Sequence, residues 1–189
     1  MARICLFGGS FDPIHAGHLH IARAAQQACA IDELVFLPAA CSPFKTDSKH
    51  LFSDAQRIQL LQDATGHLPW ARVSKLDLTL PHPSYSWRLV EHWRSTAPDC
   101  ELYWLMGVDQ WQELKRWGRY NYLVENLHFI VYHRDAEPQP REGVRSTFLS
   151  GHHPASASAI REAIKTGTRP PADYLCKGSW ERIQQMLSH

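Results

Sequence analysis

The sequence predicts an α/β protein built on a Rossmann-like, doubly wound and mostly parallel sheet. Brief apolar runs rich in β-forming residues occur at residues 2–7, 33–37, 101–106 and 127–132. Such runs are typical of strands that are buried on both faces. Segments with helical periodicity lie between them, and this alternation favours a doubly wound sheet with right-handed crossovers. The ligand crevice of such a sheet lies at the carboxyl ends of its strands.

The first two helices are predicted from their apolar spacing. The apolar positions of the first helix share one face and are Ile21, Ala24, Ala25, Ala28 and Cys29. The second helix begins after Ser53, which forms the Ser-x-x-Gln spacing of a capping box with Gln56. Its apolar face carries Ala55, Ile58 and Leu61. Each helix follows one of the predicted strands, as the alternation requires.

Two later helices complete the pattern. One is predicted to begin near Ser84, with an apolar side formed by Tyr85, Leu89 and Trp93. The other follows Ser156 or Ser158 and stops at Gly167, because glycine just past the end is a common helix stop. We expect Trp87, Trp93 and Trp104 to pack in the core.

The length of 189 residues predicts one domain, residues 1–189, in which residues 168–189 form a C-terminal helical extension. Twenty Lys and Arg against nineteen Asp and Glu leave a formal charge of +1, so the average charge identifies no partner, and no nucleic acid is expected. No apolar run approaches the roughly 18 residues of a membrane span, and no signal peptide is evident, which predicts a cytoplasmic protein. The sequence says nothing about oligomeric state.

Five cysteines without a Cys-x-x-Cys pair predict buried thiols rather than disulfides or a zinc site. The neighbouring His152 and His153 lack a cysteine or carboxylate at ligand spacing. No resident metal site is therefore expected.

The turn between the first strand and the first helix is the strongest functional signal. Adjacent glycines, Gly8 and Gly9, allow a phosphate to approach the backbone, and the free N–H groups of the helix start favour an anion. The turn matches neither the Walker A nor the dinucleotide-binding pattern. His15 and His18 flank the helix start, where imidazolium or imidazole N–H groups can hold phosphate oxygens. A lone histidine is more often structural, but the pair in a glycine-rich turn favours ligand binding.

Residues 8–13, GGSFDP, with His15-x-Gly17-His18 resemble the signature of the nucleotidyltransferase superfamily, and most closely that of the nicotinate-nucleotide adenylyltransferase family. The resemblance implies a fold of the nucleotidyltransferase type. Class I aminoacyl-tRNA synthetases share the His-x-Gly-His element, but this chain is short and lacks their Lys-Met-Ser-Lys-Ser segment.

Other motifs extend the resemblance over most of the chain. Residues 43–45, PFK, resemble the family's Pro-His-Lys loop, and residues 83–86, PSYS, resemble its Pro-Ser-Tyr-Thr element. Gly107-x-Asp109 and the downstream Trp117 also have counterparts, and residues 156–161, SASAIR, are similar to Ser-Ser-Thr-x-Ile-Arg. On spacing alone Lys45 would be an exposed lysine, Asp109 could be a helix N-cap, and the serines near 156 could be ordinary caps.

The resemblance implies adenylyl transfer from ATP to nicotinate mononucleotide, giving deamido-NAD and pyrophosphate, in NAD biosynthesis. The implied catalytic residues are His15, His18 and Arg161. The residues implied to bind ATP are Gly8, Gly9, Ser10, Phe11, His15, His18, Gly107, Asp109, Ser156, Ser158 and Arg161. Those implied to bind the mononucleotide are Ser10, Asp12, Lys45, Tyr85, Ser86 and Trp117. Mg²⁺ is expected to arrive with ATP.

Several residues depart from the family pattern, and they leave alternatives open. Phe44, Ser86, Ala157 and Gly118 replace the usual His, Thr, Ser and Tyr. Alternative acceptors are nicotinamide mononucleotide, phosphopantetheine or, with a cytidylyl donor, a small phosphate alcohol. A different kind of alternative is a catalytically weak nucleotide-binding sensor, in which the Trp- and His-rich surface binds a partner.

Overall fold

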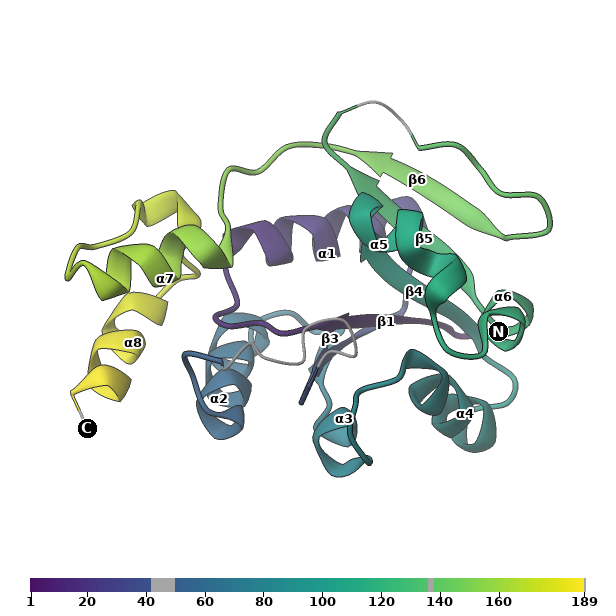
Figure 1. Cartoon of the computed structure of the whole chain (residues 1–189), viewed down its shortest axis with the longest axis horizontal. Coiled ribbons are helices and arrows are strands. Elements are labelled where there is room, and N and C mark those ends of the chain that lie inside the picture. Colours follow the sequence, from purple (N-terminus) through teal and green to yellow (C-terminus); the bar gives the residue numbers. More distant parts are fainter. Residues whose placement is uncertain (42–49, 136–137, 189) are drawn as a thin grey trace.

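Six strands form one fully parallel sheet, in the order β3-β2-β1-β4-β5-β6. The computed structural model describes residues 1–41, 50–135 and 138–188 (Figure 1). The strands are β1 (Arg3–Gly9), β2 (Glu33–Pro38), β3 (Ala71–Val73), β4 (Glu101–Gly107), β5 (His128–His133) and β6 (Ser146–Ser150). The order reverses between β1 and β4, so the predicted doubly wound sheet is confirmed and its crevice lies beside β1.

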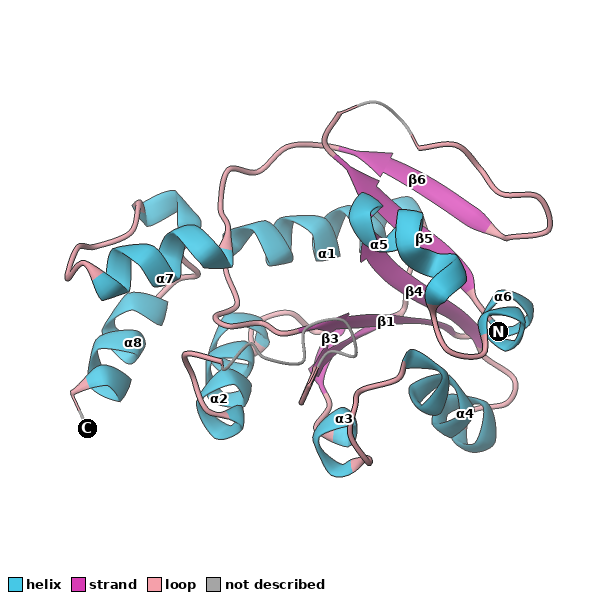
Figure 2. Cartoon of the chain, in the orientation of Figure 1, coloured by secondary structure: helices cyan, strands magenta, loops and turns pink. Residues whose placement is uncertain are grey.

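Helices connect the strands. They are α1 (Ala16–Ala28), α2 (Asp54–Thr65), α3 (Leu76–Thr79), α4 (Ser86–Thr96), α5 (Val108–Glu113), α6 (Tyr120–Asn126), α7 (Ala157–Lys165) and α8 (Ser179–Leu187). A loop without helix or strand leads from β6 to α7 (Figure 2). Helices α7 and α8 lie at one end of the molecule, away from β6 (Figure 1). Within the described ranges, no helix is long and apolar enough to span a membrane.

Two apolar clusters cover the two faces of the sheet. Alternate residues of a strand point to opposite faces, so Cys5 and Phe7 of β1 join a cluster with α1, α2 and α8, in which Ile183 is fully buried. Leu6 of β1 and Trp104 of β4 join the other cluster, with α4, α5 and α6. Burial on both faces explains why the central strands have continuous apolar sequences.

The predicted helices occur, with small shifts at their ends. Ser53 caps α2 and forms the expected reciprocal pair with Gln56. Helix α4 begins at Ser86 rather than near Ser84, and Ser156, not Ser158, is the N-cap of α7. Trp93 and Trp104 are buried as predicted, whereas Trp87 is only partly buried.

The edge strands β3 and β6 were not expected from the sequence. Strand β3 has only three residues, and no residue of β3 or β6 is fully buried. Partly exposed edge strands lack the continuous apolar run that marks the buried strands, so their sequences carry little strand signal.

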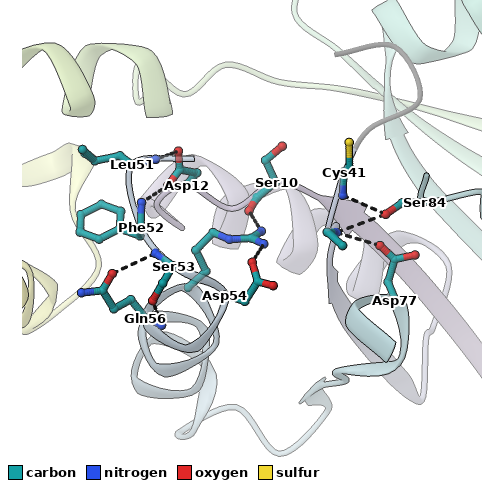
Figure 3. Close-up of polar contacts among 12 residues, drawn as sticks. Ser10, Asp12, Cys41, Leu51, Phe52, Ser53, Asp54, Gln56, Asp77 and Ser84 are labelled. Atoms are coloured by element: carbon teal, nitrogen blue, oxygen red, sulfur yellow. Dashed lines mark hydrogen bonds and ion pairs between the residues drawn. The ribbon is translucent and has the colours of Figure 1, made fainter. Parts of the chain in front are cut away.

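A buried arginine holds the first strand–helix turn in place. The Arg57 side chain on α2 is fully buried, donates a hydrogen bond from Nη1 to the carbonyl of Ser10, and pairs through Nη2 with Asp54 at 2.7 Å. A buried guanidinium needs hydrogen-bond acceptors, and both Nη atoms of Arg57 have one, whereas its Nε has none among the described residues. The contact therefore links the orientation of α2 to the backbone just after β1 (Figure 3).

Arg57→Met is expected to lower the free energy of unfolding by about 3 kcal/mol, because the Ser10 carbonyl and Asp54 lose their partner. Arg182→Met is the matched control. Arg182 pairs with Asp63 on the surface, where the side chains are 43% and 31% exposed, so its loss should cost less than about 1 kcal/mol. Urea unfolding followed by circular dichroism measures both values, and equal losses would contradict the role assigned to Arg57.

Candidate active site at the first strand–helix turn

A cavity of about 420 Å³ opens at the carboxyl ends of β1 and β2. Its volume is in the range of small-molecule sites. Six of the residues predicted from the sequence line it, namely Gly8, Gly9, Ser10, Tyr85, Ser86 and Trp117. Segments that are about 75 to 110 residues apart in the chain therefore meet where the topology places a ligand crevice.

The rings of the two histidines of the turn lie in contact, with an angle of 31° between their planes. His15 is the N-cap of α1 and is 7% exposed, and its ring centroid lies 3.8 Å from that of His18. The backbone N–H of His15 donates to Nδ1 of His18 at 3.3 Å, and the backbone N–H of His18 donates to the carbonyl of His15 at 2.9 Å. Phe11 packs edge-on against His18, with the two ring centroids 5.0 Å apart. This arrangement fixes the orientation of both rings.

Both imidazoles are neutral near pH 7. Burial lowers the pKa of His15 to about 4, with His153 and Arg134 adding to the effect. Burial, together with His15, also lowers the pKa of His18 well below its usual value. Because Nδ1 of neutral His18 accepts a hydrogen bond, its proton lies on Nε2. Of the two protonation states that the sequence left open, the structure favours the neutral N–H donor.

The start of α7 lies against the histidine turn. A Cβ atom on Gly17 would lie 3.0 Å from the His15 ring and 3.2 Å from the carbonyl oxygen of Ala155, so only glycine fits there without a shift. Arg161 of α7 donates to the carbonyl of Asp12 at 2.7 Å and to Oγ of Ser158 at 3.2 Å. The motif at residues 156–161 is thus joined to the first turn, as the predicted ATP site requires.

N-capping was an alternative role for both Ser156 and Asp109, and only Ser156 has it. Ser156 is an N-cap, since its Oγ accepts from the N–H of Ala159 at 3.2 Å. Asp109 is not, because Gly107 occupies the N-cap position of α5 and Asp109 lies in its first turn. Asp109 is exposed at the carboxyl end of β4, and its neighbour Gln110 lines the cavity.

Asp12 has a structural partner that the sequence did not indicate. Its carboxylate is 4% exposed, and its two oxygens accept from the N–H groups of Leu51 and Phe52 at 2.8 and 2.9 Å (Figure 3). The carboxylate thus holds the segment before α2 against the first turn. Contact of Asp12 with a mononucleotide stays a prediction. Lys45 and Phe44 lie outside the described residues.

Other residues reach the cavity without a clear sequence signal. Trp104 lines it and packs edge-on against Trp117 at 5.7 Å. Asp77 is 3% exposed and accepts through Oδ2 from the N–H of Ala40 at 3.1 Å, and Oγ of Ser84 accepts from the same N–H at 3.2 Å (Figure 3). An isolated Asp in a short helix or a Trp in a strand looks like ordinary structure, so only the fold shows that they reach the cavity.

No group of three or more His, Cys, Asp or Glu side chains is arranged to hold a metal ion within residues 1–41, 50–135 and 138–188.

His15→Gln is expected to weaken the pH dependence of stability. The unfolded chain protonates His15 near its usual pKa of about 6.5, whereas the folded chain does so only near 4, so the free energy of unfolding falls as the pH falls through this interval. Glutamine takes up no proton, and the loss on acidification should shrink. Urea unfolding midpoints of the wild type and the variant at about pH 7 and about pH 5 measure this loss of stability. A loss as large as that of the wild type would contradict the lowered pKa.

Known proteins resemble this chain in sequence. The family model described as cytidylyltransferase-like matches residues 6–163. A relative from Neisseria meningitidis serogroup C, named "Probable nicotinate-nucleotide adenylyltransferase", is 34% identical over 186 residues, which cover 91% of this chain and 93% of the relative. A relative of the same name from Methylacidiphilum infernorum is 38% identical over 132 residues, 70% of this chain, and the matched part spans 64% of that relative.

The fold is similar to that of a solved structure. Plasmodium falciparum nicotinic acid mononucleotide adenylyltransferase complexed with NaAD superposes with a TM-score of 0.79, at 17% identity, over 98% of this chain and 96% of that chain. At this identity the likeness concerns the fold. The parallel sheet and the His-x-Gly-His turn are consistent with the sequence matches. The chain belongs to the cytidylyltransferase-like family, among the relatives of the nicotinate-nucleotide adenylyltransferases.

Proposed function

We propose that this protein transfers the adenylyl group of ATP to nicotinate mononucleotide, giving deamido-NAD and pyrophosphate. The observation that carries the proposal is the junction between the histidine turn and α7, made by Arg161 on the carbonyl of Asp12, beside a cavity lined by Trp117 and Tyr85. The proposed anion site and the proposed aromatic site would thus lie on two sides of the same turn. The names of the relatives and the ligand of the Plasmodium falciparum structure agree with this reading.

ATP is assigned to the side of the turn that faces α7. Gly8, Gly9, Ser10 and Phe11 would follow the phosphates along the backbone, and Gly107 and Asp109 would meet the ribose at the end of β4. The N-terminus of α7, with Ser156 and Ser158, would hold the β- and γ-phosphates, because the free N–H groups of a helix start attract anions. Arg161 would neutralise charge on the departing pyrophosphate.

The mononucleotide is assigned to the cavity. Trp117 offers an aromatic face for the pyridine ring, and Tyr85 and Ser86 lie at the N-terminus of α4, where backbone N–H groups are available to a carboxylate. Ser10, Asp12 and Lys45 complete the predicted set. Their roles remain predictions.

The reaction needs no covalent intermediate. An oxygen of the mononucleotide 5′-phosphate forms a bond to the α-phosphorus of ATP, and the bond from that phosphorus to the α–β bridging oxygen breaks, so pyrophosphate leaves with the electron pair. A phosphate monoester is already anionic, and no general base is required. The neutral Nε2–H of His18 would donate to the phosphate oxygens as charge develops, and the adjacent His15 ring would hold it in orientation.

Mg²⁺ is proposed to arrive with ATP. Mg²⁺ prefers oxygen ligands, and the phosphate oxygens of ATP and water would supply them. When bound, it would supply positive charge to the pyrophosphate. A cytoplasmic location remains a prediction from the sequence.

His18→Ala is expected to lower kcat by about 100-fold or more, with a much smaller change in the KM of either substrate, because a donor that acts on developing charge contributes mainly in the transition state. Pyrophosphate release measured over a range of both substrates provides the two constants. His20→Ala is the matched control, because it removes a neighbouring, partly exposed histidine of the same helix, α1. Wild-type turnover in His18→Ala would remove His18 from the mechanism.

The acceptor is identified by pyrophosphate release from ATP with nicotinate mononucleotide, nicotinamide mononucleotide or phosphopantetheine, each offered separately. We expect the highest kcat/KM with nicotinate mononucleotide. Preference for nicotinamide mononucleotide would keep the enzyme and change its acceptor, and activity with phosphopantetheine alone would overturn the aromatic site. Release with none of them would favour a nucleotide-binding sensor.

A further inference from the structure

We propose that Trp87 is a positioning residue that joins the two walls of the mononucleotide cavity and so sets the placement of Trp117. The inference rests on the proposed function for its kinetic consequence. Trp87 lies on α4 and is partly buried. Among the described residues it does not line the cavity, whereas Tyr85, Ser86, Trp117 and Gly118 on either side of it do.

The first wall is the segment that leads into α4. The guanidinium of Arg88 donates to the carbonyl of Pro83 at 3.0 Å and also to the carbonyl of Pro81. Its Cζ lies 5.0 Å from the Tyr85 ring centroid and 5.1 Å from that of Trp87. The Tyr85 and Trp87 rings are stacked, with centroids 6.3 Å apart. Trp87 is therefore held in one unit with the wall that carries Tyr85 and Ser86.

The second wall is the segment that carries Trp117, and it approaches Trp87 at a residue without a side chain, Gly118. A Cβ atom on Gly118 would lie 3.3 Å from Cδ1 and from Nε1 of Trp87, and 3.5 Å from Cδ1 of Tyr85. A contact this close to the indole is tight for any side chain at residue 118. Glycine thus lets the main chain directly after Trp117 rest on Trp87.

Arg119, in the segment that carries Trp117, also contacts Trp87. Arg119 has a left-handed backbone, with φ 55° and ψ 45°, a conformation that is uncommon outside glycine and needs support from its surroundings. Its Cζ lies 4.9 Å from the Trp87 ring centroid and 4.4 Å from that of Tyr122, and its guanidinium pairs with Glu91 of α4. Cation–π contacts of this kind favour one placement of the chain after Trp117.

These contacts give Trp87 an indirect role. Trp117 packs against the buried Trp104 on one side, and the chain that follows it packs against Trp87. Loss of the indole would leave a gap between the walls and remove the surface that Gly118 and Arg119 rest on. The pyridine ring would then lose a defined stacking distance, whereas the turn at residues 8–18 keeps its own supports.

The test compares Trp87→Ala with Trp87→Phe and with Trp70→Ala, a matched loss of a partly buried tryptophan that packs against the other core cluster. Trp87→Ala should raise the KM of nicotinate mononucleotide about tenfold and leave the KM of ATP within about twofold. Trp87→Phe should restore part of the difference, and Trp70→Ala should change neither KM. Thermal melts show that each variant is folded at the assay temperature. Equal changes in both KM values, or none in a folded Trp87→Ala protein, would overturn the proposal.

A second measurement separates this proposal from the proposed function. In protein labelled with 5-fluorotryptophan, the ¹⁹F resonance of Trp117 is identified by its loss in Trp117→Phe. Trp87→Ala should shift or broaden that resonance and Trp70→Ala should not, whatever substrate the enzyme uses. If the wild type ignores pyridine mononucleotides but the resonance responds, only the proposed function fails. An unchanged Trp117 resonance in Trp87→Ala would remove the positioning role.

Discussion

The main chain of the first strand–helix turn is held by two arginine side chains, and the rest of the site depends on this. Arg57 binds the carbonyl of Ser10 from α2, and Arg161 binds the carbonyl of Asp12 from α7. The Asp12 carboxylate holds the segment before α2 in return. Carbonyls that are bound in this way cannot turn toward a ligand, so they do not oppose the approach of an anion.

Burial decides how the histidines of this turn can act. A buried imidazole loses the hydration that stabilises its charged form, and the pKa of both His15 and His18 falls. The site therefore presents aimed N–H groups beside Arg161 and the start of α7, rather than a cluster of imidazolium ions. This agrees with a formal charge of only +1 for the whole chain, because a few local donors can meet a triphosphate without a basic surface.

The central strands and the long helices were predictable because each carries its own local signal. The buried strands β1, β2, β4 and β5 are continuous apolar runs, and α2 has its capping box. The edge strands β3 and β6 were not, since a partly exposed strand has no such run. Likewise, most of the predicted site residues were found from the resemblance of their motifs to a known family. Trp104 and Asp77 were not, because their own segments contain nothing that separates them from core or surface residues.

The sequence by itself determined the α/β class and the motif residues of the first turn, and it predicted that this turn binds an anion, because glycine pairs, histidine spacing and apolar periodicity are local properties of the chain. Only the tertiary structure decided which motifs meet, which tautomer His18 adopts, and that Asp12 serves the backbone of Leu51 and Phe52. The same holds for the contact of Trp87 with Gly118. These features depend on contacts between residues that are brought together by the folded sheet, and burial and hydrogen-bond partners exist only once those contacts form.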